Sequence, residues 1–382
     1  MTAILPGATI GILGGGQLGR MTAMAARTLG YRVQVMDPDP SCPARFVVDA
    51  CFEGGWDDAR VAADLARGWD VVTLEIEQVS LASLEAAAKY APVRPNATLM
   101  RIVQDRILQK TWLAEHGFPL GDWRAIRSEE ELAEAVVALG EKVFVKSAQG
   151  GYDGRSQVKI GFGNPTNASE AWRLLGGKAC VAEKALDLDR EISVMVARAP
   201  NGETKSFPSA LNHHEHQILE WSVIPSAVPA DIEAKAQRIA ADIAAGLGAE
   251  GLLAVEMFLT KSGELLVNEL APRPHNSYHA SELACVTSQF EQAVRAVCDL
   301  PLGDTSIVQT AAIANLLGEV WLGENGELRE PRFDLALAVP GVTLHLYEKH
   351  KPRKGRKMGH LSAVGKTQDE AVQRVMEAKG LL

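Results

Sequence analysis

Two glutamates, Glu256 and Glu269, interrupt two apolar segments that are spaced like the strands of a β-hairpin. The segments are Leu252–Leu259 and Leu265–Leu270, and a turn signal lies between them. A loop of two or four residues centred on Ser262-Gly263 places Glu256 directly opposite Glu269 on one face of the sheet. Opposed Cβ atoms lie about 5 Å apart, where two negative charges repel each other. The spacing therefore predicts a paired-carboxylate site.

Three arrangements could relieve the repulsion between Glu256 and Glu269. The side chains could splay into solvent, they could share a proton as an acid/base dyad, or a cation could lie between them, because burying two bare charges is costly. A hard divalent ion such as Mg²⁺, held by carboxylates and substrate phosphates, suits these ligands. The magnesium pair is the favoured interpretation, and the other two stay open.

A stiff polar loop, Pro272–Ser277, follows the second of these strands. Within it, Arg273 and His275 can contact anionic reactants or the charge that develops in a transition state. The loop should lie at the mouth of the same sheet as the two glutamates. It therefore extends the predicted site from metal ligands to groups that bind anions.

A glycine-rich turn near the N-terminus could bind a phosphate. Gly14, Gly16 and Gly19 fit G-x-G-x-x-G between an expected strand and an expected helix, and Asp37 ends the next strand. This pattern fits a dinucleotide, with amides for a phosphate and an acid for a ribose. A different phosphate ligand and a purely structural turn remain equally open.

A second glycine-rich loop, Gln149–Arg155, lies between two expected strands, and Lys146 ends the strand before it. The sequence contains no G-x-x-x-x-G-K-[ST], which excludes a Walker P-loop. A glycine-rich hairpin can still cover phosphates with backbone amides, as the kinase loop does. Beside such a loop, Lys146 is better interpreted as a phosphate-binding lysine than as a surface lysine.

Two further polar groups carry weaker signals. The cluster of His213, His214 and His216 has no other ligands at a persuasive spacing for zinc. The basic segment Lys351–Lys357 is either a solvated face or a local phosphate clamp in an acidic protein. No Ser-His-Asp or Cys-His set stands out.

The bulk composition sets the class of protein around these motifs. The chain has 382 residues, 47% of them apolar, which predicts two or three domains with ample core. The net charge of −9 argues against a nucleic-acid groove. Five cysteines without a C-x-x-C pair argue for reduced thiols. Because no leader peptide and no run of 18 apolar residues occurs, we expect a cytoplasmic protein without a membrane span.

The elements that must position the motifs change in type along the chain. The segments Ala8–Leu13, Arg32–Met36 and Asp70–Leu74 predict a parallel, doubly wound start with helices between the strands. The middle of the chain alternates helices with strands of antiparallel character. A last region, from about Leu300, carries several short strands.

Taken together, the motifs resemble the ATP-grasp family of 5-(carboxyamino)imidazole ribonucleotide synthetases nearly end to end. The landmarks are Gly14–Met21, Asp105-Arg106 followed by Lys110, Gly150–Arg155, Asn268–Arg273 with His275–Ser277, and Gly355–His360. The last three separate this family from other ATP-grasp ligases. Ser156 departs from a frequent loop glycine, and Leu74–Val79 matches the family's aromatic-rich version only loosely.

The resemblance implies a mixed α/β and α+β fold of three domains. Residues 1–104 would form a doubly wound, Rossmann-like pre-ATP-grasp domain. Residues 105–299 would form an ATP-grasp domain of two α+β halves, with a lid at about 118–186, and residues 300–382 a small β-rich domain. The first glycine loop would then face the ribonucleotide, and no NAD would bind.

The resemblance also implies roles for matching residues. ATP would be bound by Arg106, Lys146, Gly151, Tyr152, Asp153, Gly154, Arg155, Ser156, Gln157, Glu183, Lys184, Ala185, Leu186, Glu191, His214, Asn268 and Glu269. The metal, Mg²⁺ or alternatively Mn²⁺, would be held by Glu256, Glu269 and Asn268. The ribonucleotide would be bound by Gly16, Gln17, Leu18, Glu75, Tyr152, Arg155, Arg273, His275, Asn276, Ser277, Lys349, Arg356 and Lys357. Asp153, Arg155, Arg273, His275 and Lys357 would act in catalysis.

The implied reaction joins ATP, bicarbonate and 5-aminoimidazole ribonucleotide through carboxyphosphate, with Asp153 steering or deprotonating the amine. A homodimer and a transient hand-off to the downstream mutase are also implied. Three rival functions stay open: another ATP-grasp enzyme such as a biotin carboxylase or a formate-using transformylase, an NAD(P)-binding oxidoreductase, and a silent nucleotide-binding module. The carboxylate pair and Lys146 argue against the last.

Overall fold

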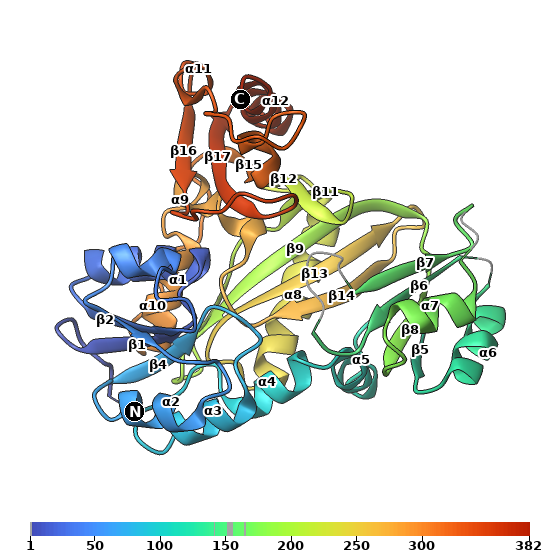
Figure 1. The fold of residues 1–382 in the computed structure, drawn as a ribbon, viewed down its shortest axis with the longest axis horizontal. Helices are drawn as coiled ribbons and strands as arrows, with labels where there is room; N and C mark the ends of the chain where they lie inside the picture. The colour runs from blue at the N-terminus through green and yellow to red at the C-terminus, as the bar shows by residue number, and fades with distance from the viewer. Residues whose placement is uncertain (1, 141, 151–155, 164–165) are drawn as a thin grey trace.

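The computed structural model describes residues 2–140, 142–150, 156–163 and 166–382. Its strands form three sheets, of four, nine and four strands, and each sheet has its own covering helices (Figure 1). Among the described residues, no helix is long and apolar enough to cross a membrane. The predicted Gly151, Tyr152, Asp153, Gly154 and Arg155 lie outside the described residues.

The N-terminal sheet is parallel, with the order β3-β2-β1-β4. Its strands are β1 (Thr9–Leu13), β2 (Arg32–Asp37), β3 (Ala50–Glu53) and β4 (Val71–Leu74). The helices around it are α1 (Gln17–Thr28), α2 (Ala59–Ala66), α3 (Leu81–Ala87) and α4 (Ala97–Val103), with a short 3₁₀ helix, Pro43–Phe46. All residues of β1 and β4 are buried, as parallel strands covered on both faces require. The doubly wound start predicted from sequence is confirmed.

The second sheet is antiparallel, with the order β5-β8-β6-β7, and forms the right-hand lobe of Figure 1. Its strands are β5 (Trp123–Ile126), β6 (Val143–Ser147), β7 (Gln157–Ile160) and β8 (Cys180–Lys184). Helices α6 (Glu129–Leu139) and α7 (Ala168–Leu174) pack on it, and α5 (Arg106–Glu115) leads into it. Ser128 caps α6 by accepting a hydrogen bond from the amide of Glu131.

The largest sheet runs β14-β13-β9-β11-β12-β15-β17-β16, with β10 paired to β9. Its strands are β9 (Leu188–Arg198), β10 (Thr204–Ser206), β11 (Ala210–Glu215), β12 (Ile218–Ile224), β13 (Gly251–Thr260), β14 (Leu265–Ala271), β15 (Thr310–Leu317), β16 (Val342–Leu346) and β17 (Lys357–Gly365). The last three belong to the C-terminal region, yet β15 pairs directly with β12. One sheet therefore joins the middle of the chain to its C-terminal part.

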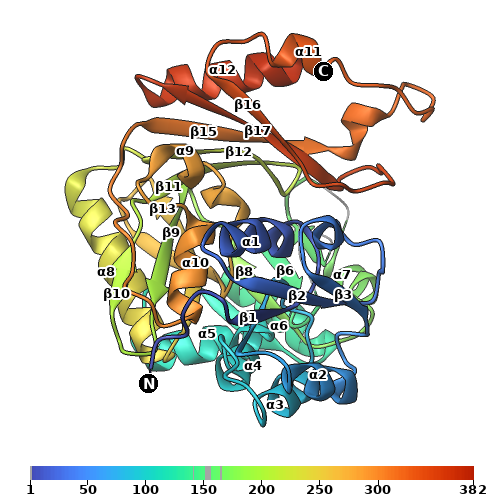
Figure 2. The ribbon, with the colours of Figure 1, turned by 90° about the vertical axis from the view of Figure 1, so that its left-hand side faces the viewer.

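The helices of this half cover different parts of the large sheet. They are α8 (Ala230–Gly246), α9 (Ser281–Ala284), α10 (Gln289–Val297), α11 (Phe333–Ala336) and α12 (Gln368–Gly380), with short 3₁₀ helices at Asn276–Tyr278 and Gly318–Trp321. Figure 2 shows α11 and α12 above β15–β17, and α10 beside α1 of the N-terminal sheet. The contact between α1 and α10 fixes the first glycine turn relative to the large sheet.

The β13–β14 hairpin confirms the predicted partner of Glu256 but not the predicted turn. Glu256 pairs with Glu269, whereas Leu259 pairs with Leu265, so the loop has three residues, 261–263. Thr260 and Glu264 close this loop with a 2.9 Å backbone hydrogen bond, and Gly263 takes the left-handed φ of +85° that such loops need. A β-bulge then restores the opposition of the glutamates.

The β-bulge inserts one extra residue, Asn268, into β14 and changes the direction of its side chain. Successive residues of a regular strand point to opposite faces, so a regular β14 would direct Asn268 away from Glu269. The extra residue instead re-aims the local side chains. The Asn268 amide consequently reaches the Glu256 carboxylate, 3.4 Å away, and the Lys146 ammonium, also 3.4 Å away.

Candidate active site

A cavity of about 900 Å³ lies where the three sheets meet. Every described residue to which the family resemblance gives a binding, metal or catalytic role lines it, apart from Ser277. From the first glycine turn and its neighbours come Gly16, Gln17, Leu18 and Glu75; from the central sheets Arg106, Lys146, Ser156, Gln157, Glu183, Lys184, Ala185, Leu186, Glu191, His214, Glu256, Asn268 and Glu269; and from the later loops Arg273, His275, Asn276, Lys349, Arg356 and Lys357.

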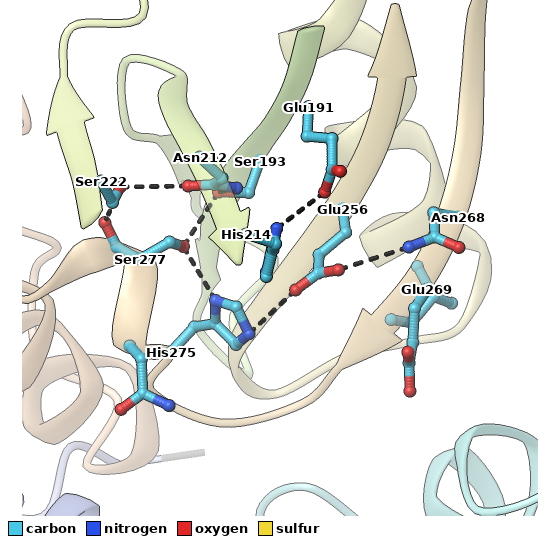
Figure 3. A network of polar contacts seen from close by, with 12 residues as sticks. Glu191, Ser193, Asn212, His214, Ser222, Glu256, Asn268, Glu269, His275 and Ser277 are labelled. Carbon is cyan, nitrogen blue, oxygen red and sulfur yellow. Dashed lines mark hydrogen bonds and ion pairs between the residues drawn. The ribbon is translucent and has the colours of Figure 1, made fainter. Parts of the chain in front are cut away.

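The two opposed carboxylates engage different partners, and Figure 3 shows those of Glu256. The His275 Nε2 lies 3.1 Å from Glu256 Oε1, and Arg106 Nη2 lies 3.1 Å from Glu269 Oε1. Burial opposes ionisation of Glu256, but His275, His214 and Lys146 outweigh it and lower its pKa to about 2. Lysine and histidine side chains thus favour the anionic form of Glu256, which supports the cation-binding interpretation over a dyad that shares a proton.

A second charged group lies beside this pair. The Glu183 carboxylate lies between two lysines, 2.8 Å from Lys146 Nζ and 3.0 Å from Lys110 Nζ. Burial opposes its ionisation, but the two lysines lower its pKa to about 2. The family resemblance implies that Glu183 binds ATP, and the structure turns its carboxylate toward the two lysines. The sequence identified Lys110 only as a landmark of the family, because its ion pair with Glu183 depends on the tertiary fold.

We expect the Glu183→Gln variant to change the response of the protein to acid. A carboxyl whose folded pKa lies at about 2, below its ordinary 4.5, stabilises the fold above pH 4.5 and loses that contribution as the pH falls toward 2. Chemical denaturation between pH 7 and pH 2 should show a smaller loss of unfolding free energy in Glu183→Gln than in the wild type. The exposed Glu134→Gln is the control, and equal slopes in both variants would contradict the assignment.

The histidine cluster separates in the fold. A bulge in β11 lies between His213 and His214, so they have different surroundings. His213 stacks on Trp221 with ring centroids 5.0 Å apart, while His214 Nδ1 lies 2.7 Å from Glu191 Oε2. Burial opposes protonation of His214, but Glu191 and Glu256 outweigh it and raise its pKa. The three histidines therefore do not share a zinc ion.

The first glycine turn is already occupied by carboxylates of the chain itself. Glu75 accepts hydrogen bonds from the amides of Gly16 at 2.8 Å and of Leu18 and Gly19 at 3.1 Å. Asp37 accepts one from the amide of Gly15 at 2.7 Å. These are the amides that a dinucleotide phosphate would need. The structure therefore contradicts the NAD interpretation, and it gives Glu75 a helix-capping position at the rim of the cavity.

An ion pair that the sequence did not reveal holds the predicted anion-binding loop. Arg273 Nε lies 2.7 Å from Glu77 Oε1, and both side chains line the cavity. Burial opposes the charge on Arg273, but Glu77 and Glu75 outweigh it and raise its pKa. Glu77 lies in the segment that matched the family only loosely. The ion pair between Glu77 and Arg273 could not be predicted from sequence spacing, because 196 residues separate the two.

The basic segment near the C-terminus contributes to the same cavity. Lys349, Arg353, Arg356 and Lys357 line it, and Lys357 is buried. The Lys349 ammonium donates to Gln17 Oε1 at 2.7 Å and to the Lys357 carbonyl at 2.8 Å, which ties this segment to the first glycine turn. A local basic wall thus exists in a chain whose net charge is −9. It favours the phosphate clamp over a solvated face.

Ser277 is the one described residue that the structure removes from the predicted lining. Its side chain is fully buried, and its Oγ lies 2.8 Å from His275 Nδ1 and 2.9 Å from Ser193 Oγ. Figure 3 shows Ser277 bonded to one ring nitrogen of His275, while the other ring nitrogen faces Glu256. Its hydroxyl is therefore positioned to act on His275 and not on a bound substrate.

The five cysteines are all free, as expected. Cys42 and Cys51 have Sγ atoms 3.6 Å apart without a bond between them. Burial raises the pKa of Cys42 to about 12, with Cys51 adding to the shift, so its thiol stays protonated. The Cys42 thiol is therefore not activated for chemistry.

Comparison with known proteins gives three matches along the chain. The ribonucleotide synthetase preATP-grasp domain matches residues 7–104, the ATP-grasp domain residues 111–290, and the phosphoribosylaminoimidazole carboxylase C-terminal domain residues 311–374. Together these matches include strands of all three sheets described above.

Relatives that align with nearly the whole chain point to the same family as the domain matches. The N5-carboxyaminoimidazole ribonucleotide synthase of Bacillus subtilis is 39% identical over 97% of this chain and 95% of its own, and that of Brucella melitensis 38% over 95% and 98%. The structure of the Staphylococcus aureus N5-carboxyaminoimidazole synthetase complexed with ADP has a TM-score of 0.90 at 33% identity, covering 99% and 98% of the two chains. The structure of the Aspergillus clavatus synthase in complex with ADP and 5-aminoimidazole ribonucleotide has a TM-score of 0.88 at 30% identity, covering 98% of each chain.

Proposed function

The chain belongs to the N5-carboxyaminoimidazole ribonucleotide synthase family, and from this premise we propose how its cavity carries out the reaction. The protein is an ATP-dependent carbon–nitrogen ligase that carboxylates 5-aminoimidazole ribonucleotide to the N5-carboxyamino product in purine biosynthesis. One observation carries the residue assignment: a single cavity holds a carboxylate pair, two lysines, and an adjoining wall of Arg273, His275 and basic residues.

ATP occupies the side of the cavity formed by the four-stranded antiparallel sheet and α5. Lys146 and Lys110 neutralise its phosphates, and Glu183 keeps both ammonium groups at the correct place. Lys184, Ala185 and Leu186 border the adenine, and Ser156 and Gln157 the phosphates. Glu191 with His214 completes the rim. Gly151–Arg155, which lie outside the described residues, are proposed to cover the phosphates.

The carboxylate pair fits Mg²⁺, with Mn²⁺ as an alternative. Glu256, Glu269 and Asn268 offer oxygen ligands of the kind that hard cations prefer. Each carboxylate oxygen has two lone pairs, so the contacts of Glu256 with His275 and Asn268 leave room for a further ligand. When bound, the ion would supply positive charge next to the γ-phosphoryl group that is transferred. Arg106 then stays close to Glu269 and extends the positive field.

The acceptor side of the cavity adjoins the carboxylate pair at His275, whose Nε2 lies 3.1 Å from Glu256 Oε1. A bicarbonate oxygen attacks the γ-phosphorus of ATP, ADP leaves, and carboxyphosphate forms. The exocyclic amine of the ribonucleotide then attacks the carboxyl carbon and inorganic phosphate leaves, with Asp153 proposed to take the amine proton. Arg273 and His275 hold the carboxyl and phosphate oxygens, and Arg356, Lys357 and Lys349 hold the ribonucleotide phosphate with Gly16, Gln17, Leu18 and Asn276 nearby.

An ADP-release assay tests the function. ADP formation from ATP and bicarbonate should be slow alone and strongly stimulated by 5-aminoimidazole ribonucleotide, because only then is carboxyphosphate consumed. Biotin and glycinamide ribonucleotide with formate serve as rival acceptors. A rate that one of these raises, and the aminoimidazole ribonucleotide does not, would assign the chain to a different ATP-grasp ligase.

Two finer features are part of the proposal. We propose a homodimer, which light scattering of the purified protein would test. We also propose that the chain acts in the cytoplasm and passes its product directly to the downstream mutase. A coupled assay in which added trap competes with the mutase for the product distinguishes hand-off from free diffusion.

A further inference from the structure

Three side chains of the kind that bind transition metals come together outside the cavity. Glu282 on α9, His345 on β16 and His360 on β17 each offer one ligand atom, and these atoms lie within 4.8 Å of one another. None of the three lines the cavity of about 900 Å³. Helix α9 contacts β17, and Figure 1 shows it at the end of β16. The cluster therefore lies between the central part of the chain and the C-terminal strands.

The β16–β17 ladder sets the two histidines side by side. His345 and His360 are directly opposed partners in this antiparallel pair, so both side chains leave the same face of the sheet. Opposed residues of this kind have Cβ atoms about 4.5–5.5 Å apart, and the two ring centroids are 5.2 Å apart. The backbone register thus presents two imidazoles together, and Glu282 adds a carboxylate from a separate element.

The ring of His360 is held from outside the cluster. Its Nδ1 lies 2.8 Å from the Tyr347 hydroxyl, and both side chains are buried. Its face stacks on His279, with ring centroids 4.6 Å apart. The Tyr347 hydroxyl can accept the Nδ1 proton of a neutral ring, which leaves Nε2 for an ion. A ligand histidine supported through its other nitrogen is the usual arrangement in protein metal sites.

His279 itself does not belong to the ligand set. Its two ring nitrogens already have partners, Asn276 Oδ1 at 3.0 Å and Gln289 Nε2 at 3.2 Å. Within the part of the chain that the structure describes, the side chains of Glu282 and His345 make no hydrogen bond or ion pair. Two of the three candidate ligands thus have no competing partner to give up.

The ligand types select the ion. Imidazole nitrogens suit Zn²⁺ and its transition-metal neighbours, whereas Mg²⁺ and Ca²⁺ prefer oxygen. Zinc accepts two histidines and a carboxylate, with water in the fourth tetrahedral position, and its bonds of about 2.0–2.1 Å place ligand atoms about 3.3 Å apart. Glu282 is exposed and His345 half-buried, so an ion can enter from solvent and both side chains can rotate toward it.

We propose that Glu282, His345 and His360 form a zinc site separate from the carboxylate pair of the cavity. Its ion would tie α9, which lies in the ATP-grasp match, to two strands of the C-terminal match. Because no ligand reaches the cavity, the ion holds these elements together and takes no part in the transfer of the phosphoryl or carboxyl group. The proposal goes beyond the proposed function and does not depend on it.

Zinc binding to the metal-stripped, full-length protein tests the proposal. Calorimetric titration is done in excess Mg²⁺, which competes for Glu256 and Glu269, and we expect one zinc ion to bind per chain. Anomalous diffraction at the zinc absorption edge, from crystals of the zinc-loaded protein, then locates the ion. We expect the peak between Glu282, His345 and His360. A peak at the carboxylate pair alone, or no bound zinc, would overturn the proposal.

The variants His345→Gln and Glu282→Gln test the ligands in solution. Losing an outer partner of a metal ligand already costs 10–100-fold in affinity, so losing a ligand should weaken zinc binding by at least about 100-fold. Zinc should raise the Tm of the wild type and not that of either variant. Both altered side chains are at least partly exposed, and the Tm without zinc shows whether each variant is folded.

The matched control is His350→Gln, which removes an exposed histidine five residues further along the chain. It should bind zinc as the wild type does. Wild-type zinc affinity in His345→Gln or Glu282→Gln, or an equal loss in His350→Gln, would contradict the assigned ligands. None of these measurements uses ATP or the ribonucleotide, so a failed ADP-release assay would reject the proposed function and leave the zinc site standing.

Discussion

Replacing Glu269 with glutamine is expected to abolish measurable ADP formation, with or without the ribonucleotide. The substitution keeps the size of the side chain but removes one of the two anions that the opposed pair offers to a divalent cation. Loss of one preorganised charge contact to a transition state lowers kcat by about 10²–10³-fold, and here metal affinity falls as well. Steady-state ADP release and electron paramagnetic resonance of bound Mn²⁺ measure the two effects.

The control for this substitution is Glu264→Gln. Glu264 lies in the exposed turn of the same hairpin and tests whether any loss of a glutamate from β13–β14 disturbs the fold. Glu264→Gln should retain full activity and Mn²⁺ binding. Near-normal turnover in Glu269→Gln would reject the metal assignment of the pair, whereas lost turnover with unchanged Mn²⁺ binding would limit Glu269 to its ion pair with Arg106.

The second large effect is expected for Arg273→Lys, and it should fall on the acceptor half of the reaction. Arg273 carries a raised pKa and is fixed by Glu77, so its guanidinium can meet carboxyl and phosphate oxygens with two donors at once. A lysine keeps the charge but lacks this planar fork. We expect stimulation of ADP release by the ribonucleotide to fall by about 10²-fold, while ATP binding is unchanged.

Glu77→Gln separates the position of Arg273 from its chemistry. This variant keeps the guanidinium but weakens the contact that holds it, so it should lower the ribonucleotide-stimulated rate less than Arg273→Lys does. ATP affinity measured by calorimetry should be the same in the wild type and both variants. A loss of ATP affinity in Arg273→Lys would move this residue to the nucleotide side of the cavity.

The sequence predicted contacts that follow from local periodicity. The opposition of Glu256 and Glu269 followed from two apolar strands and one turn, although the actual loop has three residues and a bulge at Asn268 corrects the register. The loop length was missed because it depends on the closure of Thr260 on Glu264 and on the left-handed conformation of Gly263. Neither is visible in a hydrophobic pattern.

Contacts between distant segments were beyond such reasoning. The Glu75 carboxylate accepts a hydrogen bond from the amide of Gly16, which is 59 residues away in the sequence. The Glu183 carboxylate contacts Lys110 only when α5 packs near β8. A glycine turn looks the same whether a ligand or the protein's own carboxylate fills it.

The pairing of β15 with β12 affects how the molecule could be divided. Trp221–Ile224 bond to Ala311–Ala314, so a chain that ended near residue 299 would leave β12 with unpaired backbone groups along one side. Such an open strand edge invites pairing with other molecules and leads to aggregation. The C-terminal region therefore covers the edge of β12. Its loss should be seen first as insolubility of the protein rather than as altered chemistry.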